Sequence, residues 1–327
     1  MKYELYGLGN PLMDLLVEVD EAEFSRFNLK KGQFHLVSKE DFMRIKGDLL
    51  GKEVTFSPGG STSNVISIFT MLGGKGYFCG KVGNDGVADY YEKEMNDLGI
   101  KTKLIRGKEL TGTAITFITP DSERTFAVYL GDALNMNKGD VDLEALRESK
   151  ALFVGGYELE DPNLREVTLY AMNFAKKHNI MICIDLADPG IIEREKKLLR
   201  HIVDEYADIV FSNEAEATAL TGSVSAEDAL DYMAKLCQVV VVKLGNRGSV
   251  IKEGERTVRI KGIKVDAIDT TGAGDIYAGA FIYAYLKGHD LEVAGNLGSF
   301  LAASVVTQIG ARLQELPDVS HIMNVKN

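Results

Sequence analysis

The chain has 327 residues, of which 45% are hydrophobic and 26% charged, a composition that predicts a folded globular protein and argues against disorder. Its formal net charge of −11, from 48 acidic and 37 basic residues, lacks the concentrated cationic face that nucleic-acid binding requires. Neither an export signal nor an apolar segment long enough to cross a bilayer is visible, so we expect a cytoplasmic protein that does not bind membranes.

Two regions in the first half of the chain are predicted to form strands joined by turns, residues 11–37 and 103–130. Helical segments of the core are expected between them, at 61–73 and 86–99. Because helical segments separate the two strand regions, we expect them to pair in space as one small sheet and not to form an independent domain.

The expected lid is therefore a small β-sheet built from residues 11–37 and 103–130. It would cover one end of a larger core made of residues 1–10, 38–102 and 131–327. Open faces of small sheets tend to be covered by a partner, so the exposed face of this lid also offers a surface for a homodimer.

The second half of the chain alternates short β-branched runs with longer amphipathic segments. The runs are residues 151–156, 180–186, 208–212 and 238–245, and two further strands at 249–254 and 257–262 look like an antiparallel pair. Helices are expected at 162–179, at 190–203 and from 213 onward. Continuous apolar strands separated by helices are typical of a parallel sheet buried on both faces, which predicts an α/β core.

Residues 267–288 contain a glycine-led start to an apolar helix, AIDTTGAGDIYAGAFIYAYLKG. Gly272, Ala273 and Gly274 place small residues where this helix begins, so its free backbone amides can bind an anion with help from the helix dipole. Asp275 follows in the first turn, close enough to take a proton from a hydroxyl held over the same amides. The residues also fit an ordinary helix start, with Asp269 or Asp275 as the cap and the glycines as a loop.

The segment Asp269–Asp275 resembles the DTxGAGD signature of the ribokinase-like (PfkB) family of carbohydrate and nucleoside kinases, and the resemblance spans nearly the whole chain. FSPGGSTSNV at 56–65 is similar to the family's di-glycine signature. The resemblance implies a three-layer α/β sandwich with a mostly parallel central sheet and a small β-sheet lid. It also implies that Asp275 is the catalytic base and that Gly272, Ala273 and Gly274 form an anion hole.

Other segments resemble the substrate-binding parts of this family. GLGNPLMDLL at 7–16 places Asn10 and Asp14 near the end of the first strand, and Asp14 matches the acidic residue that accepts hydrogen bonds from vicinal sugar hydroxyls. The turn arginine Arg124 could reach over the transferred phosphate or be solvated. The substrate-binding residues implied by the resemblance are Asn10, Asp14, Gly59, Gly60, Asn64, Arg124 and Tyr157.

Two further segments resemble the nucleotide-binding parts. Asn213 and Glu216 match the family's NxxE motif, although these residue types also suit a helix N-cap and a first-turn acid. VVKLGNRGS at 241–249 resembles the strand and glycine loop beside ATP, with Lys243 where threonine is frequent. The ATP-binding residues implied are Asn213, Lys243, Gly245, Gly248, Thr270, Gly272 and Ser304. The resemblance also implies Mg²⁺ held through water at Glu216, and it allows K⁺ at Asp269.

Within the family the N-terminal third looks most similar to adenosine kinases, so a nucleoside is the first expected substrate. In those enzymes an aromatic pair follows the strand glycine, whereas here Tyr157 is aromatic and Glu158 is not. Two alternatives therefore stay open. One is a kinase of a free sugar or sugar acid, of the ribokinase, fructokinase or ketodeoxygluconate kinase type, and the other is a catalytically silent ligand-binding homologue.

Overall fold

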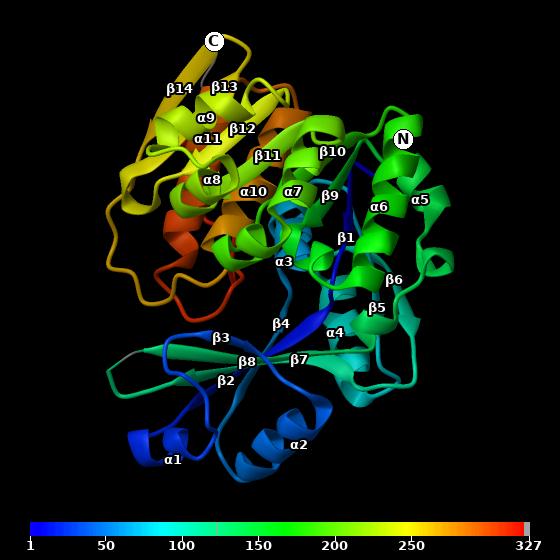
Figure 1. The fold of residues 1–327 in the computed structure, drawn as a ribbon, viewed down its shortest axis with the longest axis vertical. Helices are drawn as coiled ribbons and strands as arrows, with labels where there is room; N and C mark the ends of the chain where they lie inside the picture. The colour runs from blue at the N-terminus through cyan, green and yellow to red at the C-terminus, as the bar shows by residue number, and fades with distance from the viewer. Residues whose placement is uncertain (122, 324–327) are drawn as a thin grey trace.

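The described part of the chain builds two β-sheets of unequal size, a large sheet of nine strands and a small one of five (Figure 1). A computed structural model describes residues 1–121 and 123–323. The large sheet has the strand order β14 (Arg256–Lys261), β13 (Gly248–Glu253), β12 (Val239–Lys243), β11 (Ile209–Asn213), β10 (Met181–Asp185), β9 (Ala151–Gly155), β1 (Leu5–Leu8), β5 (Gly76–Val82) and β6 (Lys101–Arg106). Its strands are parallel except at the antiparallel β12–β13–β14 end.

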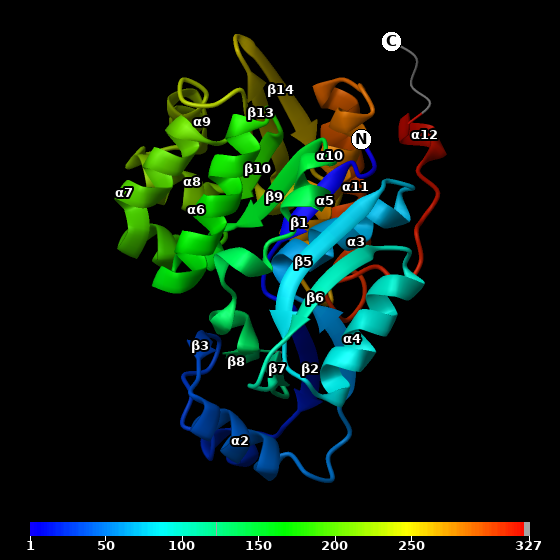
Figure 2. The ribbon, with the colours of Figure 1, turned by 90° about the vertical axis from the view of Figure 1, so that its right-hand side faces the viewer.

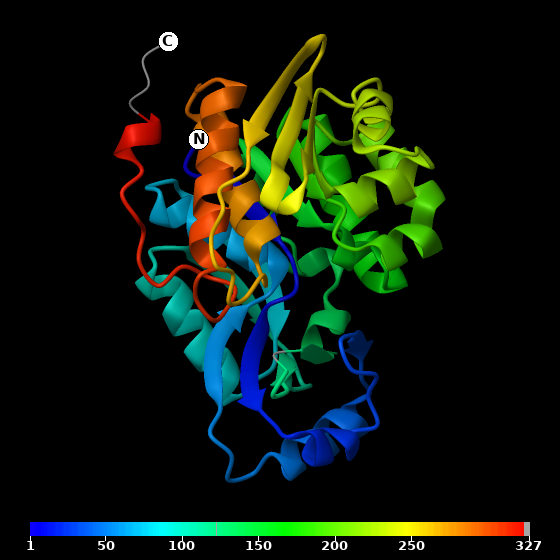
Figure 3. The same cartoon turned by 90° about the vertical axis from the view of Figure 1, so that its left-hand side faces the viewer.

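Helices cover both faces of the large sheet. One face packs against α5 (Leu143–Arg147), α6 (Pro162–Lys177), α7 (Pro189–Glu205), α8 (Glu214–Thr221) and α9 (Ala226–Met233). The other packs against α3 (Ser61–Met71), α4 (Gly86–Asp97), α10 (Ala273–Leu286) and α11 (Leu291–Val305), and the last helix is α12 (Ser320–Met323) (Figure 3). No helix in the described part of the chain is both long and apolar enough to span a bilayer.

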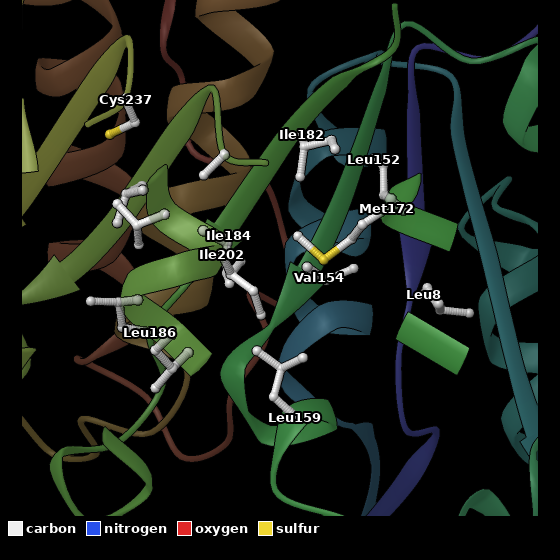
Figure 4. Packing of buried hydrophobic residues seen from close by; sticks show 14 of the residues in the cluster. Leu8, Leu152, Val154, Leu159, Met172, Ile182, Ile184, Leu186, Ile202 and Cys237 are labelled. Carbon is white, nitrogen blue, oxygen red and sulfur yellow. The ribbon is translucent and has the colours of Figure 1, made fainter. Parts of the chain in front are cut away.

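The two cores follow from the alternation of side chains along each strand. Leu152 and Val154 of β9 enter the core beneath α6 and α7, where Ile182 and Met172 also lie (Figure 4). Phe153, between them, enters the opposite core. Because neighbouring strand residues point to opposite faces and both faces are buried, the run is continuously apolar, and the predicted α/β sandwich with a mostly parallel sheet is confirmed.

The small sheet has the order β3 (Phe34–Leu36), β8 (Arg124–Gly131), β7 (Thr111–Ile118), β2 (Leu12–Glu18) and β4 (Thr55–Gly59). Two helices, α1 (Glu21–Ser25) and α2 (Lys39–Asp48), lie on its outer side, away from the large sheet (Figure 1). Figure 2 shows α2 in the same place from a second side. Phe24 and Phe42 from these helices pack with Ile115 and Phe117 of β7 in a third apolar core. The chain's own helices therefore cover the outer face of the small sheet.

The strands do not follow the expected lid boundaries. Residues 38–59 were assigned to the core, but β4 pairs antiparallel with β2, so this segment and α2 belong with the small sheet. Residues 103–106 were assigned to the lid, but β6 pairs parallel with β5 after the crossover helix α4. Both differences arise from long-range strand pairing, which sets sheet membership and leaves little trace in the local sequence.

Candidate active site

A cleft of about 1590 Å³ separates the small sheet from the carboxyl ends of the large-sheet strands. This edge of a parallel sheet is where α/β proteins commonly bind ligands. Most of the predicted site residues line the cleft: Asn10, Asp14, Gly60, Asn64, Tyr157, Asn213, Glu216, Lys243, Gly245, Gly248, Thr270, Gly272, Ala273, Gly274 and Asp275. The structure thus brings together residues that are more than 250 positions apart in the chain.

The start of α10 requires glycine at Gly272. This residue has φ 75°, in the left-handed region, and a Cβ there would come within 2.4 Å of the carbonyl oxygen of Ala311. A Cβ on Gly274 would lie 3.0 Å from Nζ of Lys243. The helix start is therefore tightly enclosed on one side and faces the cleft on the other, with the free amides of its first turn available to an anion.

Asp275 is held by two side chains from the first turn of α3. Its Oδ1 accepts a hydrogen bond from Ser61 Oγ at 2.6 Å, and its Oδ2 accepts one from Asn64 Nδ2 at 2.9 Å. Burial raises the pKa of Asp275 to about 6, although these two hydrogen bonds act in the opposite direction. Its carboxyl group is thus oriented toward the cleft, with a pKa suited to accepting a proton near neutral pH.

The di-glycine turn before α3 fits closely against the substrate end of the cleft. A Cβ on Gly59 would lie 2.2 Å from Oδ2 of Asp14, and a Cβ on Gly60, whose φ is 90°, would lie 2.3 Å from the carbonyl oxygen of Asn10. Asp14 is located within β2 of the small sheet and not at the end of the first core strand. Its depth in the cleft raises its pKa to about 7.

At the other end of the cleft, Lys243 Nζ donates a hydrogen bond to Asp185 Oδ2 at 2.7 Å. Burial alone would lower the pKa of Lys243, but the carboxylates of Asp185 and Glu216 outweigh it and raise the pKa. Asn213 and Glu216 form the reciprocal capping box of α8, each side chain accepting the other's backbone N–H at 2.8 Å. Both residues therefore cap α8 and also line the cleft.

This end of the cleft suits Mg²⁺ in the company of phosphate oxygens. Asp185 and Glu216 present hard carboxylate oxygens, which Mg²⁺ prefers. Among the described residues, however, no three acidic, histidine or cysteine side chains converge closely enough to hold a metal ion themselves. The residues therefore fit an ion that keeps several water or phosphate ligands, as Mg²⁺ commonly does.

Four of the predicted residues are not part of the cleft lining: Gly59, which packs against Asp14, and Arg124, Asp269 and Ser304, which have contacts of their own. Arg124 forms an ion pair with Asp269, which is only 2% exposed. Asp269 also accepts the backbone N–H groups of Thr271 at 2.9 Å and Gly310 at 2.8 Å, so protein donors already bind the carboxylate to which a monovalent cation was assigned. Ser304 donates to the carbonyl of Phe300 within α11 and is not among the residues that line the cleft, so its contact with ATP stays a prediction.

Tyr157 has an aromatic partner that the sequence did not indicate. Phe34 of β3 faces it across the cleft, with 6.5 Å between the ring centroids and an angle of 33° between the planes.

Glu158, the residue after Tyr157, points into the protein. Its Oε1 accepts the backbone N–H of Asn10 at 3.1 Å, whereas its buried Oε2 has no hydrogen-bond partner.

The sequence interpretation missed four functional candidates: Ser61, Asp185, Arg312 and Phe34. Asp185 carried a usable signal, because it ends a predicted parallel strand and therefore lies at the ligand-binding edge. Ser61 directly follows the di-glycine pair, at the first position of α3. Arg312 and Phe34 lie in irregular or edge segments and carried no local signal.

Comparison with known proteins identifies the family to which the chain belongs. Residues 33–318 match the model of the pfkB family carbohydrate kinases. The chain is 30% identical over 284 residues to a 5-dehydro-2-deoxygluconokinase of Bacillus licheniformis, covering 82% of this chain and 87% of that one. An adenosine kinase of Sinorhizobium meliloti is similar with a TM-score of 0.88 at 28% identity, covering 96% and 97%. A probable sugar kinase of Rhizobium etli is similar with a TM-score of 0.88 at 27% identity, covering 96% of each chain.

These likenesses confirm the predicted ribokinase-like fold and the predicted similarity to adenosine kinases in structure. The sequence relatives include kinases of a sugar acid, which agrees with one of the alternatives left open above. Because the match to the family model spans most of the chain, from residue 33 to residue 318, this protein belongs to the pfkB family of carbohydrate kinases and is an ATP-dependent carbohydrate or nucleoside kinase.

Proposed function

We propose that the protein transfers the γ-phosphoryl group of ATP to a primary hydroxyl of a nucleoside. The observation that carries the choice of a nucleoside is the facing pair Phe34 and Tyr157, whose side chains stay 52% and 38% exposed. A planar ring contacts each neighbouring ring at roughly 3.5–4.0 Å. A lid movement of about 1 Å would therefore widen the 6.5 Å spacing enough to admit a base between the two rings. A free sugar has no aromatic ring to place between the two side chains.

The acceptor's hydroxyl groups would be oriented by Asp14, Asn64 and the backbone of Gly60. Asp14 accepts hydrogen bonds, while the amide of Asn64 can donate and accept them. Asp275 would take the proton of the attacking hydroxyl, for which a pKa of about 6 makes it ionised and still basic enough at neutral pH. The amides at the start of α10 would stabilise the charge that develops on the transferred group.

The nucleotide would occupy the other end of the cleft. ATP supplies the phosphoryl group, and Mg²⁺ neutralises charge on its oxygens. Lys243 holds a positive charge beside Gly274, where a phosphate on the α10 amides would benefit from it. Glu216 and Asp185 would bind the waters of the metal ion. Arg124, in its ion pair with Asp269, would hold the lid strand β8 against the core during the reaction.

A sugar acid is the second candidate acceptor, because relatives at 30% identity are named 5-dehydro-2-deoxygluconokinases. The charge of the site opposes this candidate. Asp14 and Asp275 put two carboxyl groups at the acceptor end, and a bound carboxylate would be repelled by those that are ionised. A silent ligand-binding homologue is disfavoured because such a protein would have no use for an oriented base at Asp275.

The test is an acceptor panel of nucleosides, neutral sugars and sugar acids, with ADP release as the readout. We expect the highest kcat/KM with a nucleoside, and a higher value with a sugar acid would refute the nucleoside assignment. The Asp275→Asn variant should lose about 10²-fold to 10⁴-fold in kcat while still binding ATP. Asp89→Asn, at an exposed position of α4, is the control and should leave kcat unchanged. Near-normal turnover of Asp275→Asn would show that the base is assigned incorrectly.

A further inference from the structure

One guanidinium group connects the C-terminal segment with the di-glycine helix start. Arg312 follows α11, and its side chain reaches the first turn of α3. Its Nε donates to Asn64 Oδ1 at 2.9 Å, and one of its terminal nitrogens donates to Ser63 Oγ at 2.6 Å. The other terminal nitrogen lies 3.5 Å from Sδ of Met95 in α4. Each of the three guanidinium nitrogens therefore has a partner in α3 or α4.

The contact with Asn64 decides which way its amide points. An amide side chain has one accepting oxygen and one donating nitrogen, and they lie on opposite sides. The Nε–H of Arg312 can only donate, so it fixes the Asn64 oxygen toward itself. The Asn64 nitrogen must then point away from Arg312, and there it donates to Asp275 Oδ2 at 2.9 Å. The orientation of the base thus depends on an arginine that does not touch it.

The contact with Ser63 anchors the guanidinium to the backbone. Ser63 accepts from Arg312 and its hydroxyl donates to the carbonyl of Gly59 at 2.5 Å. The same carbonyl accepts from Tyr91 of α4 at 3.1 Å. Since Gly59 packs directly against Asp14, the guanidinium plane is tied to the same turn that shapes the acceptor end of the cleft.

Arginine suits this task better than lysine. Two of its N–H groups point in fixed directions within one plane and can meet Asn64 and Ser63 together, whereas an ammonium group on a flexible stem has no fixed pair of directions. The segment that carries Arg312 also reaches the phosphate end of the site. Gly310 donates to Asp269, and the backbone of Ala311 closes against Gly272.

We propose that Arg312 is a positioning residue for phosphoryl transfer: its planar guanidinium sets the orientation of the Asn64 amide and, through it, that of the Asp275 carboxylate. The proposal rests on the proposed function, in which Asp275 is the base. It predicts that loss of Arg312 acts on kcat through Asn64 and leaves nucleotide binding intact. A merely structural arginine would lower stability without this dependence on a second residue.

The test is a double-mutant cycle with Arg312→Met, Asn64→Ala and the combined variant, measured as kcat with the best acceptor and as KM for ATP. A misplaced reacting group can cost about 10²-fold in rate, so we expect Arg312→Met to lower kcat by that order. In the Asn64→Ala background the same change should cost less than about threefold, because the amide that it orients is gone. Arg106→Met, which removes a guanidinium from β6 that does not line the cleft, is the control and should keep the parent kcat.

Two results would overturn the proposal: parental kcat in a folded Arg312→Met, or the full loss repeated in the Asn64→Ala background. If thermal unfolding shows that Arg312→Met is not folded, Arg312→Lys replaces it in the same cycle with the same criteria, since lysine keeps the charge but not the planar fork. The parent enzyme and Asp275→Asn are measured first. Absence of kinase activity, or a fully active Asp275→Asn, would count against the proposed function irrespective of Arg312.

Discussion

Replacement of Glu158 by glutamine should stabilise the protein at alkaline pH. The side chain is 5% exposed, and burial raises its pKa to about 7 from the ordinary 4.5. The folded protein therefore keeps this proton at pH values where the unfolded chain has lost it. Because the folded state binds more protons between about pH 4.5 and 7, the contribution of Glu158 to the free energy of unfolding falls as pH rises through this window.

The size of the effect follows from the two pKa values. At a pH above both, the difference between about 7 and 4.5 corresponds to about 3 kcal/mol, which we treat as an upper bound. Glutamine keeps a carbonyl oxygen for the backbone N–H of Asn10 and cannot ionise. Its amide nitrogen would replace the unpartnered Oε2 on the side where Thr62 Oγ1 also lacks a partner. We expect Glu158→Gln to gain about 1–3 kcal/mol at pH 8.

The assay is urea unfolding of the parent and the variant at pH 5 and at pH 8. The gain should be smaller at pH 5 by about 2 kcal/mol, because the folded parent is then already protonated at Glu158. Glu160→Gln is the control, since Glu160 is more exposed and paired with Arg194, and it should show no such pH-dependent gain. An equal gain at both pH values, or a loss at pH 8, would show that burial does not raise the pKa of Glu158.

Two further predictions concern the reaction. The kcat of the parent should fall about tenfold per pH unit below pH 6, because Asp275 must be ionised to accept a proton; a pH–rate profile that is flat down to pH 5 would contradict this. Lys243→Met should raise the KM for ATP and lower kcat/KM about 10-fold to 100-fold, because it removes a charged donor beside the α10 amides and leaves Asp185 without its partner. The measurement is an ATP titration with Lys101→Met, at the edge of the large sheet, as the control. Equal KM values for ATP in the two variants would show that Lys243 does not bind the nucleotide.

The sequence predicted those parts of the fold and site that depend on local patterns. Continuous apolar runs such as β9 and β12 predicted the parallel sheet. A strand that is buried on both faces has apolar residues at consecutive positions, whereas a half-exposed strand alternates apolar and polar residues. The small residues before Asp275 indicated an open helix start, because a side chain at Gly272 would strike Ala311. The helix start could be predicted from the sequence because all the residues that form it lie within one helical turn.

The parts that could not be predicted depend on pairing between distant segments. Phe34 belongs to a three-residue edge strand with no distinctive pattern, and it meets Tyr157 only because β3 pairs with β8. The predicted lid boundaries were wrong for the same reason, since β4 pairs with β2 although α1, β3 and α2 lie between them in the chain. Arg312 lies in an irregular segment whose course after α11 is set by packing against Gly272 and not by any periodicity.

The electrostatics of the cleft link stability to ligand binding. Asp14, Glu158 and Asp275 all have raised pKa values because burial disfavours their charged forms. Such an arrangement is unfavourable for folding at neutral pH, and groups of strongly shifted pKa are typical of functional sites. In the proposed function a bound acceptor would bring hydroxyl donors to Asp14 and Asp275, so it should return part of the lost stability. The free energy of unfolding should therefore rise more on acceptor binding at pH 8 than at pH 5, where these carboxyl groups are already protonated and need no donors.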